Sequence, residues 1–129
     1  MLKIYGIPTL NTIKVILAAE QLGLDYEYIQ MDFSKGEHKT PEHLQRHPLG
    51  KVPAIEHDGK FLFESNAIVI YLARIADSSL FPEEGYEQAI VLQWVDMMTN
   101  HPGRWLGAHY FEHFIKPTFL QGTPDESAL

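Results

Sequence analysis

Residues 48–68 read Pro-Leu-Gly-Lys-Val-Pro-Ala-Ile-Glu-His-Asp-Gly-Lys-Phe-Leu-Phe-Glu-Ser-Asn-Ala-Ile, and this stretch decides the fold. Asp58-Gly59 stands between two apolar runs and predicts a hairpin with strands near residues 52–56 and 61–63. Pro53 is expected at the start of the first strand, because proline has no N–H for the ladder, and it is a candidate cis-proline. Ser65 is a candidate N-cap of a following helix. The stretch thus predicts a corner suited to a small peptide with a carboxylate.

The residues before this hairpin predict a β-α-β unit. Leu2 to Tyr5 is a short strand closed by Gly6, and a helix is expected from Thr12 to Gly23. The apolar face expected for this helix comprises Ile13, Ile16, Leu17, Ala19 and Leu22. Residues 25–31 alternate in the manner of a second strand, and two strands joined by a helix are normally parallel.

A polar loop is expected at residues 32–39, followed by a short helix at 40–44 with Thr40 as cap and Pro41 at its first position. After the hairpin, a helix is expected over residues 65–76. The order is β-α-β-α-β-β-α, which predicts an α/β fold with a four-stranded sheet and helices on both sides.

Beyond this unit the sequence predicts helices only. Residues 77–85 have the composition of a linker, and helices are expected at 86–98 and 104–115, separated at Asn100-His101-Pro102-Gly103. Lys116-Pro117 is expected to end the second helix, and Thr123 to cap a final helical turn. The predicted organisation is therefore a first domain at 1–76, a linker at 77–85 and a partial helical domain at 86–129.

The composition of the chain excludes several classes of partner and of chemistry. The chain has 129 residues, 45% of them hydrophobic, and a formal charge of -7, which argues against nucleic acid and anionic membranes as partners. No apolar run is long enough for a transmembrane helix, and the first residues lack a signal-peptide pattern, so a cytoplasmic location is expected. Cysteine is absent, which excludes disulfides, thiolate metal sites and a protein-based dithiol redox centre.

Two linked motifs resemble the glutathione transferase family. Gly50-Lys51-Val52-Pro53-Ala54 is similar to the family's G-[QK]-V-P-A segment with its cis-proline, and Phe63-Glu64-Ser65-Asn66-Ala67-Ile68 to its [FY]-E-S-x-A-I segment. Gly36-Glu37-His38-Lys39 resembles the phi-class and theta-like branches, and Pro8-Thr9-x-Asn11 the bacterial nu-class pattern. The resemblance implies a thioredoxin-like first domain and the start of the all-α C-terminal domain.

The resemblance also implies catalytic roles for Thr9 and Asn11. A transferase of this kind must stabilise the thiolate of glutathione, and a hydroxyl donor at a helix N-terminus favours the anion. Thr9 lies where serine-type classes carry their catalytic serine, and Asn11 is a second candidate donor. Both residues are alternatively plain N-caps of the helix expected at Thr12.

The glutathione-binding residues implied by the resemblance lie mainly in the opening stretch. Val52, beside Pro53, would pair its backbone with the cysteinyl part of the tripeptide. Ser65 and a helix N-terminus suit the γ-glutamyl carboxylate, and Glu64 would face its ammonium group. His38, Lys39 and Lys51 are candidates for the glycyl carboxylate; the alternative is a solvated polar loop.

Two groups of side chains in the helical part, a pair of histidines and a set of aromatic and methionine residues, can each be interpreted in more than one way. His109 and His113 have a metal-ligand spacing but no third ligand beyond Glu112, so we expect no metal. The aromatic and methionine side chains either line a cleft for an electrophile or form core: Met97, Met98, Trp105, Tyr110, Phe111 and Phe114. Uncovered, they would make an apolar patch, which together with the family predicts a homodimer.

The sequence therefore predicts a glutathione transferase that conjugates glutathione, as co-substrate, to a small hydrophobic electrophile, a reaction of detoxification. The alternatives are a glutathione-dependent disulfide or peroxide reductase, whose thiol chemistry belongs wholly to glutathione, and a non-catalytic glutathione-binding module.

Overall fold

The computed structural model describes every residue, Met1–Leu129, and the chain forms two compact units, Met1–Phe81 and Pro82–Leu129. The boundary between them falls inside the segment 77–85 that composition marks as a linker. Each unit is described by itself.

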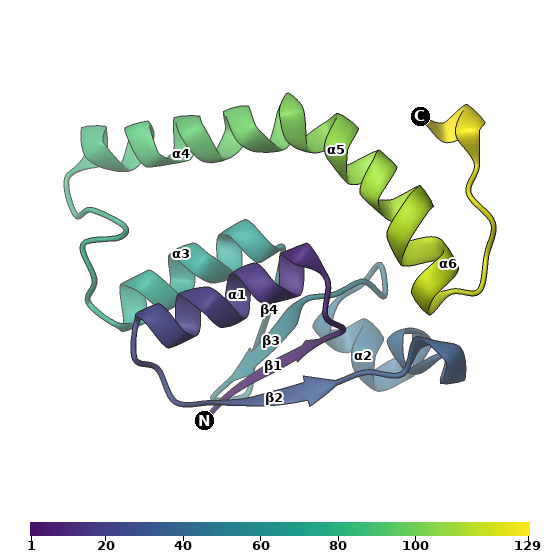
Figure 1. The fold of residues 1–129 in the computed structure, drawn as a ribbon. Helices are drawn as coiled ribbons and strands as arrows, with labels where there is room; N and C mark the ends of the chain where they lie inside the picture. Colours follow the sequence, from purple (N-terminus) through teal and green to yellow (C-terminus); the bar gives the residue numbers. More distant parts are fainter. The chain divides into compact units, whose positions relative to one another are not determined.

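The first unit is built on a four-stranded mixed sheet in the order β2-β1-β3-β4 (Figure 1). The strands are β1 (Leu2–Gly6), β2 (Tyr26–Gln30), β3 (Ala54–His57) and β4 (Lys60–Phe63). β1 and β2 are parallel, as the β-α-β pattern predicts, whereas β3 runs antiparallel to both β1 and β4. The predicted α/β topology is confirmed.

The predicted hairpin joins β3 and β4. Asp58 and Gly59 both have positive φ, 50° and 76°, which is the conformation of a type I′ turn. β3 begins at Ala54 and not at Val52, because Pro53 contributes no N–H to the ladder. The Val52-Pro53 peptide bond is cis, as the sequence suggested.

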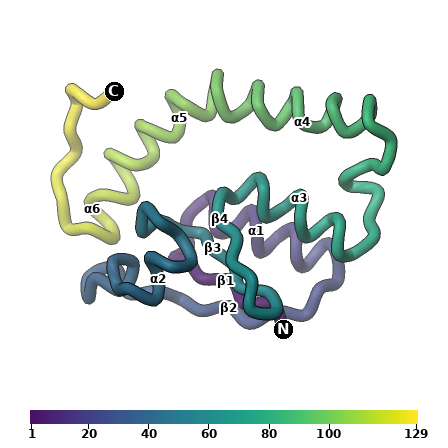
Figure 2. The backbone as a smooth tube through the Cα atoms, turned by 180° about the vertical axis from the view of Figure 1, so that it is seen from behind, coloured from purple at the N-terminus to yellow at the C-terminus, as the bar shows by residue number.

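Three helices cover the sheet. α1 (Leu10–Gln21) and α3 (Ser65–Ile75) lie side by side on one face, with their N-termini at the same end (Figures 1 and 2). α2 (Pro41–Arg46) packs on the other face, where the Arg46 guanidinium lies 4.1 Å from the centroid of the Tyr5 ring. Side chains alternate along a strand, so Tyr5 faces α2 whereas Ile4 faces the paired helices.

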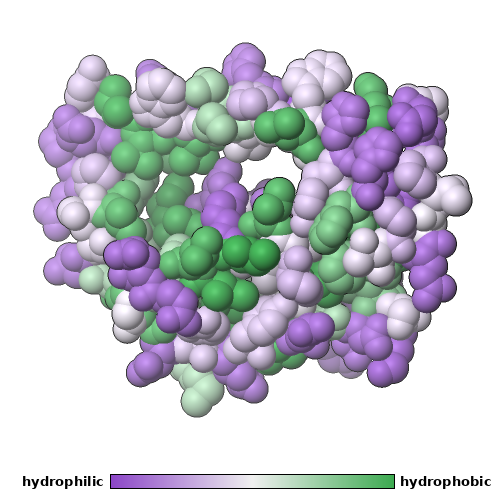
Figure 3. Space-filling model, viewed as in Figure 1, coloured by the Kyte–Doolittle hydropathy of each residue, from purple (hydrophilic) through white to green (hydrophobic).

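The core lies between the sheet and the pair α1 and α3. Its buried side chains are Leu2, Ile4, Val15, Ala19, Ile55, Ile68 and Leu72. The expected apolar face of α1 is partly wrong, because Ile13 and Leu17 are 41% and 62% exposed. The stripe that faces the core runs instead through Thr12, Val15 and Ala19. Figure 3 shows the apolar side chains that gather over the outer side of α1.

α2 follows two short 3-10 helices, η1 (Phe33–Lys35) and η2 (Glu37–Lys39), which form within the stretch expected as loop. The predicted start of α2 is confirmed: the Thr40 hydroxyl accepts the backbone N–H of His43 at 3.3 Å, and Pro41 occupies the first turn.

The second unit consists of helices. α4 (Gly85–Asn100) and α5 (Pro102–Tyr110) are separated at His101, as predicted. The expected stop at Lys116-Pro117 is wrong, because the chain continues through a π-helical turn, η3 (Phe111–Ile115), into α6 (Lys116–Phe119). The wider π turn changes the hydrogen-bond spacing before Pro117, where an ordinary α-helix would be broken. No helix in either unit combines the length and apolar character needed to cross a bilayer.

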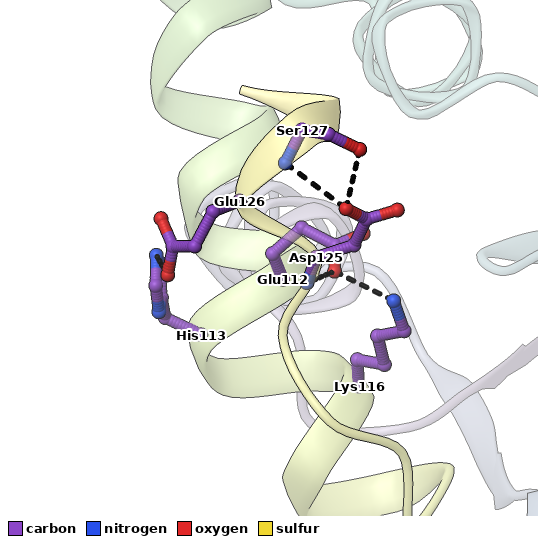
Figure 4. A network of polar contacts seen from close by, with 6 residues as sticks. All are labelled: Glu112, His113, Lys116, Asp125, Glu126 and Ser127. Atoms are coloured by element: carbon purple, nitrogen blue, oxygen red, sulfur yellow. Dashed lines mark hydrogen bonds and ion pairs between the residues drawn. The ribbon is translucent and has the colours of Figure 1, made fainter.

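The end of the chain is tethered to η3 by Glu112 (Figure 4). The buried Glu112 carboxylate accepts from Lys116 Nζ and from the Asp125 backbone N–H, both at 2.7 Å. The final turn, η4 (Glu126–Ala128), is capped by the Asp125 side chain and not by Thr123, which corrects the sequence prediction.

Candidate functional site

Strand register places three segments at one edge of the sheet. Tyr5 on β1 is opposite Ala54 on β3, and Ala54 is opposite Phe63 on β4. The residues that follow β1, precede β3 and follow β4 therefore lie at the same edge. This is how the fold brings the loop holding Thr9 and the Pro53 bend to the start of α3, although they are far apart in sequence.

Thr9 occupies the N-cap position of α1 in an extended conformation, but its side chain makes no capping hydrogen bond. Its hydroxyl is buried and lies 3.3 Å from the hydroxyl of Thr12, which is also buried. α1 begins at Leu10, so Asn11 is its second residue and not a cap. The plain capping interpretation of Thr9 and Asn11 is therefore wrong for both side chains.

Glu64 and Ser65 form the start of α3. Glu64 is at the N-cap position with φ 69° and ψ 109°, and its side chain makes no capping hydrogen bond. Ser65 is the first helical residue and not the N-cap, which corrects the sequence prediction. The first backbone N–H groups of α3 thus have no side-chain cap of their own, and a helix N-terminus of this kind suits a carboxylate.

Two polar contacts join the N-terminal turns of α1 and α3. The Ser65 hydroxyl donates to Asn11 Oδ1 at 3.4 Å, and Lys14 Nζ donates to Asn66 Oδ1 at 2.5 Å. Burial lowers the pKa of Lys14, and the nearby Glu64 carboxylate partly offsets that effect. Lys14 was missed from the sequence, since a lysine within an amphipathic helix carries no signal of a partner 52 residues away.

The loop before β3 is held by the residues around α2. Lys39 Nζ donates to the Leu49 carbonyl at 3.1 Å, and His43 Nε2 lies 2.8 Å from the Lys51 carbonyl. Between these carbonyls, Gly50 has φ 61°, and a Cβ there would lie 2.6 Å from the His38 carbonyl oxygen. This close approach requires glycine.

The three candidate cations differ in their surroundings. Lys39 is exposed but bonds the loop, whereas Lys51 is exposed beside it. His38 is stacked on the Phe33 ring at 4.0 Å, and its Nδ1 is buried without a hydrogen-bond partner. Burial, and then the charges of Lys39 and His43, lower the pKa of His38, which favours the neutral ring at pH 7.

Val52 and Pro53 complete the edge. Pro53 is buried and Val52 is partly exposed, and the β3 ladder begins only after them. At the far side of the same edge, the His47 ring contacts the Phe63 ring at 4.7 Å between centroids, which joins the end of α2 to the end of β4. His43 and His47 were missed from the sequence, because nothing in a short polar helix shows which side chains will be buried.

The second unit offers a different surface. Trp105, Phe111 and Phe114 from the predicted apolar group are each more than two-fifths exposed, as is Met98. The His109 and His113 rings stack with centroids 5.9 Å apart, and the chain contains no group of three His, Asp or Glu side chains arranged to hold a metal ion.

Comparison with known proteins gives one consistent result. The family model "Glutathione S-transferase, N-terminal domain" matches residues 1–74. A probable glutathione S-transferase, GSTF2 of Oryza sativa subsp. japonica, is 37% identical over 131 residues, covering 99% of this chain and 60% of its own length. The disulfide-bond oxidoreductase YfcG of Escherichia coli is 40% identical over 127 residues, covering 92% of this chain and 58% of its own length.

Two solved structures that resemble this chain also belong to the glutathione transferases. Glutathione S-transferase-I bound with lactoylglutathione superposes with a TM-score of 0.83 at 37% identity, covering 98% of this chain and 61% of that one. Glutathione transferase F2 from Populus trichocarpa gives a TM-score of 0.85 at 30% identity, covering 98% and 60%. The first unit is thus a thioredoxin-like N-terminal domain, and the helices after it match the start of the C-terminal domain. The chain spans about 60% of the length of the curated relatives GSTF2 and YfcG.

Proposed function

Because the chain belongs to the glutathione S-transferase family, we propose that it binds glutathione at the edge formed by Thr9, Pro53 and Ser65 and transfers it to an electrophile. The observation that carries this proposal is the joining of the two helix N-termini beside the cis-proline, through the Ser65–Asn11 and Lys14–Asn66 contacts. The sequence motifs alone do not bring these groups together.

Each part of the tripeptide has a proposed partner. The γ-glutamyl carboxylate binds the Ser65 hydroxyl and the N-terminus of α3, and Glu64 faces the ammonium group. The cysteinyl backbone pairs with Val52 beside Pro53 as an added strand. Lys51 binds the glycyl carboxylate; His38 and Lys39 lie at the same loop, with Lys39 also holding the Leu49 carbonyl.

The proposed chemistry is thiolate attack. The Thr9 hydroxyl, with Asn11 nearby, donates to the glutathione sulfur and lowers the pKa of its thiol. The thiol proton passes to water, the thiolate forms a C–S bond to the electrophilic carbon, and the leaving group departs with its electron pair. A small hydrophobic electrophile is the proposed second substrate, in a reaction of detoxification.

The test compares Thr9→Val, which keeps the shape, with Thr9→Ser, which keeps the hydroxyl. A hydrogen bond to a charged group contributes about 1.5–3 kcal/mol, so Thr9→Val should lower turnover of an aromatic electrophile by about 10- to 100-fold. Thr9→Ser should retain most of the activity, and calorimetry should give similar glutathione affinity for both. Unchanged turnover in Thr9→Val would refute the role of Thr9.

A second function is favoured by the similarity to YfcG, whose name is that of a disulfide-bond oxidoreductase. In this alternative, two glutathione thiols supply two electrons and become glutathione disulfide, while a disulfide substrate is reduced to thiols. The absence of cysteine is compatible with it, since no protein thiol takes part. Activity on a small disulfide without activity on aromatic electrophiles would select this function.

Glutathione binding without either activity would instead identify a binding module. A homodimer and a cytoplasmic location also belong to the proposal: the cytosol keeps glutathione reduced, which the reaction requires. Light scattering of the purified chain and cell fractionation check these two points.

A further inference from the structure

His43 is a buried imidazole with one hydrogen-bond partner. It is fully buried on α2, and Thr40 and Pro41 fix the start of that helix. Its Nε2 lies 2.8 Å from the Lys51 carbonyl, whereas its Nδ1 is buried and has no partner. A carbonyl oxygen only accepts, so Nε2 must carry the proton in this contact.

The charges around His43 favour the neutral ring. Burial has the largest effect and lowers the pKa of His43. The hydrogen bond to Lys51 opposes it, and the charges of Arg46 on α2 and Lys39 on η2 lower the pKa further. The other groups coupled to it, His38 and His47, are also bases. A proton on Nδ1 would be buried without an acceptor, so the ring stays neutral with its proton on Nε2.

The contact controls the direction of one peptide unit. The Lys51 carbonyl and the Val52 N–H belong to the same peptide bond, which is trans, since the one cis bond of the chain is Val52-Pro53. In a trans peptide, the C=O and N–H point in opposite directions. When His43 holds the carbonyl toward α2, the Val52 N–H is turned away from α2.

Two further hydrogen bonds hold the same loop. Lys39 Nζ holds the Leu49 carbonyl, and the Gly50 N–H donates to the His47 carbonyl at 2.8 Å. The chain is therefore held at Leu49, Gly50 and Lys51 in succession, just before Val52, which is proposed to pair with the tripeptide. Of these bonds, the one from His43 acts on the peptide unit that carries the Val52 N–H.

We propose that His43 is a positioning residue for glutathione: by holding the Lys51 carbonyl, it aims the Val52 N–H at the backbone of the bound tripeptide. This inference rests on the proposed function, and it assigns His43 no contact with glutathione itself. Pre-orienting a donor increases affinity because binding no longer bears the cost of ordering it.

The test uses His43→Leu, which removes the donor, and His43→Gln, whose amide nitrogen lies about as far from the backbone as Nε2. His57→Leu is the matched control: His57 Nδ1 contacts the Tyr71 hydroxyl at 2.6 Å, at the opposite end of β3 from Val52. It removes an imidazole contact of a partly exposed histidine from the same unit without touching the loop.

Two measurements separate positioning from general stability. Calorimetry should show glutathione affinity weakened about 10-fold in His43→Leu, as expected for loss of one oriented hydrogen bond, and within about 3-fold of wild type in His43→Gln and His57→Leu. Hydrogen exchange without glutathione should be faster at the Gly50 amide, which donates to the His47 carbonyl within the same loop, in His43→Leu alone.

Wild-type affinity in His43→Leu would overturn the inference, whether or not exchange becomes faster. Equal losses in His43→Leu and His43→Gln would also overturn it, because they would indicate packing and not the hydrogen bond. A wild-type chain that binds no glutathione would instead overturn the proposed function, and the ligand-free exchange would still decide whether His43 fixes the loop.

Discussion

The Thr9 and Thr12 hydroxyls lie 3.3 Å apart, and both side chains are buried at the first turn of α1. A hydroxyl has one proton to donate. Thr9 can give that proton either to Thr12 or to a bound sulfur, so its proposed role requires Thr12 to be the donor within the pair. Thr12 then orients the Thr9 proton toward the substrate.

This contact predicts in which direction a substitution at Thr12 shifts the pKa of the glutathione thiol. Thr12→Val removes the donor to Thr9, so the thiol pKa of bound glutathione should rise, by less than in Thr9→Val. Ultraviolet absorbance of the thiolate as a function of pH measures it. A lower thiol pKa in Thr12→Val would contradict the assignment, because it would mean that Thr12 had competed with the sulfur for the Thr9 proton.

Ser65→Ala should weaken glutathione binding by about 10-fold, the effect of losing one hydrogen bond to a charged group. The change removes both the proposed carboxylate donor and the link to Asn11. Calorimetry gives the affinity. Ser78→Ala is the control, since the Ser78 hydroxyl only accepts the Leu80 N–H in a loop after α3; an equal loss in that variant would refute a specific role for Ser65.

Gly50→Ala should lower the free energy of unfolding more than Gly23→Ala. Both glycines have positive φ, 61° and 64°, and a Cβ in this region costs about 1–2 kcal/mol. At Gly23 the Cβ would meet nothing within 4 Å, whereas at Gly50 it would meet the His38 carbonyl. Urea unfolding measures the difference, and equal losses would show that the loop can move away from His38.

Acid should destabilise the first unit through two buried histidines, His43 and His47, and the partly buried His38. The pKa values of His38, His43 and His47 are all lowered, chiefly by burial. The unfolded chain therefore binds protons first, and stability falls as pH drops below about 6.5, at up to about 1.4 kcal/mol per pH unit for each proton. Urea unfolding between pH 7 and pH 5 measures the slope, and His43→Gln should reduce it.

Glu112→Gln should release the end of the chain, because the carboxylate holds both Lys116 and the Asp125 N–H. Those hydrogen bonds lower the pKa of Glu112, so its stabilisation is present above the usual glutamate range and is lost as pH falls through the lowered value. Hydrogen exchange at Asp125 and Ser127 should become faster. Glu126→Gln, at an exposed position beside His113, should leave it unchanged.

Much of the first unit follows from local sequence. Asp58-Gly59 specifies its turn because both residues accept positive φ, and Thr40-Pro41 specifies the start of α2 through a hydroxyl and a fixed ring. These signals need no distant partner. The Pro117 prediction was wrong because the rule for proline assumes α-helical spacing, which the π turn alters.

The candidate site was predicted in part. The motifs gave Thr9, Val52, Glu64 and Ser65 as candidates, but not which side chains would contact them. Local sequence does not show whether the Thr9 hydroxyl caps its helix or bonds Thr12; in the folded chain both hydroxyls are buried together, and the cap bond is not made.

The sequence by itself determined the element order, the absence of a protein thiol and the motifs of a glutathione-binding domain, because each depends on residue type and short spacing. Only the tertiary structure decided that Lys39 and His43 hold the carbonyls of Leu49 and Lys51, and that Asn11 meets Ser65. The reason is that each contact joins two different elements, so donor and acceptor come within reach only when those elements pack. At His43 burial adds to this, because its Nε2 is excluded from water and takes its partner inside the fold.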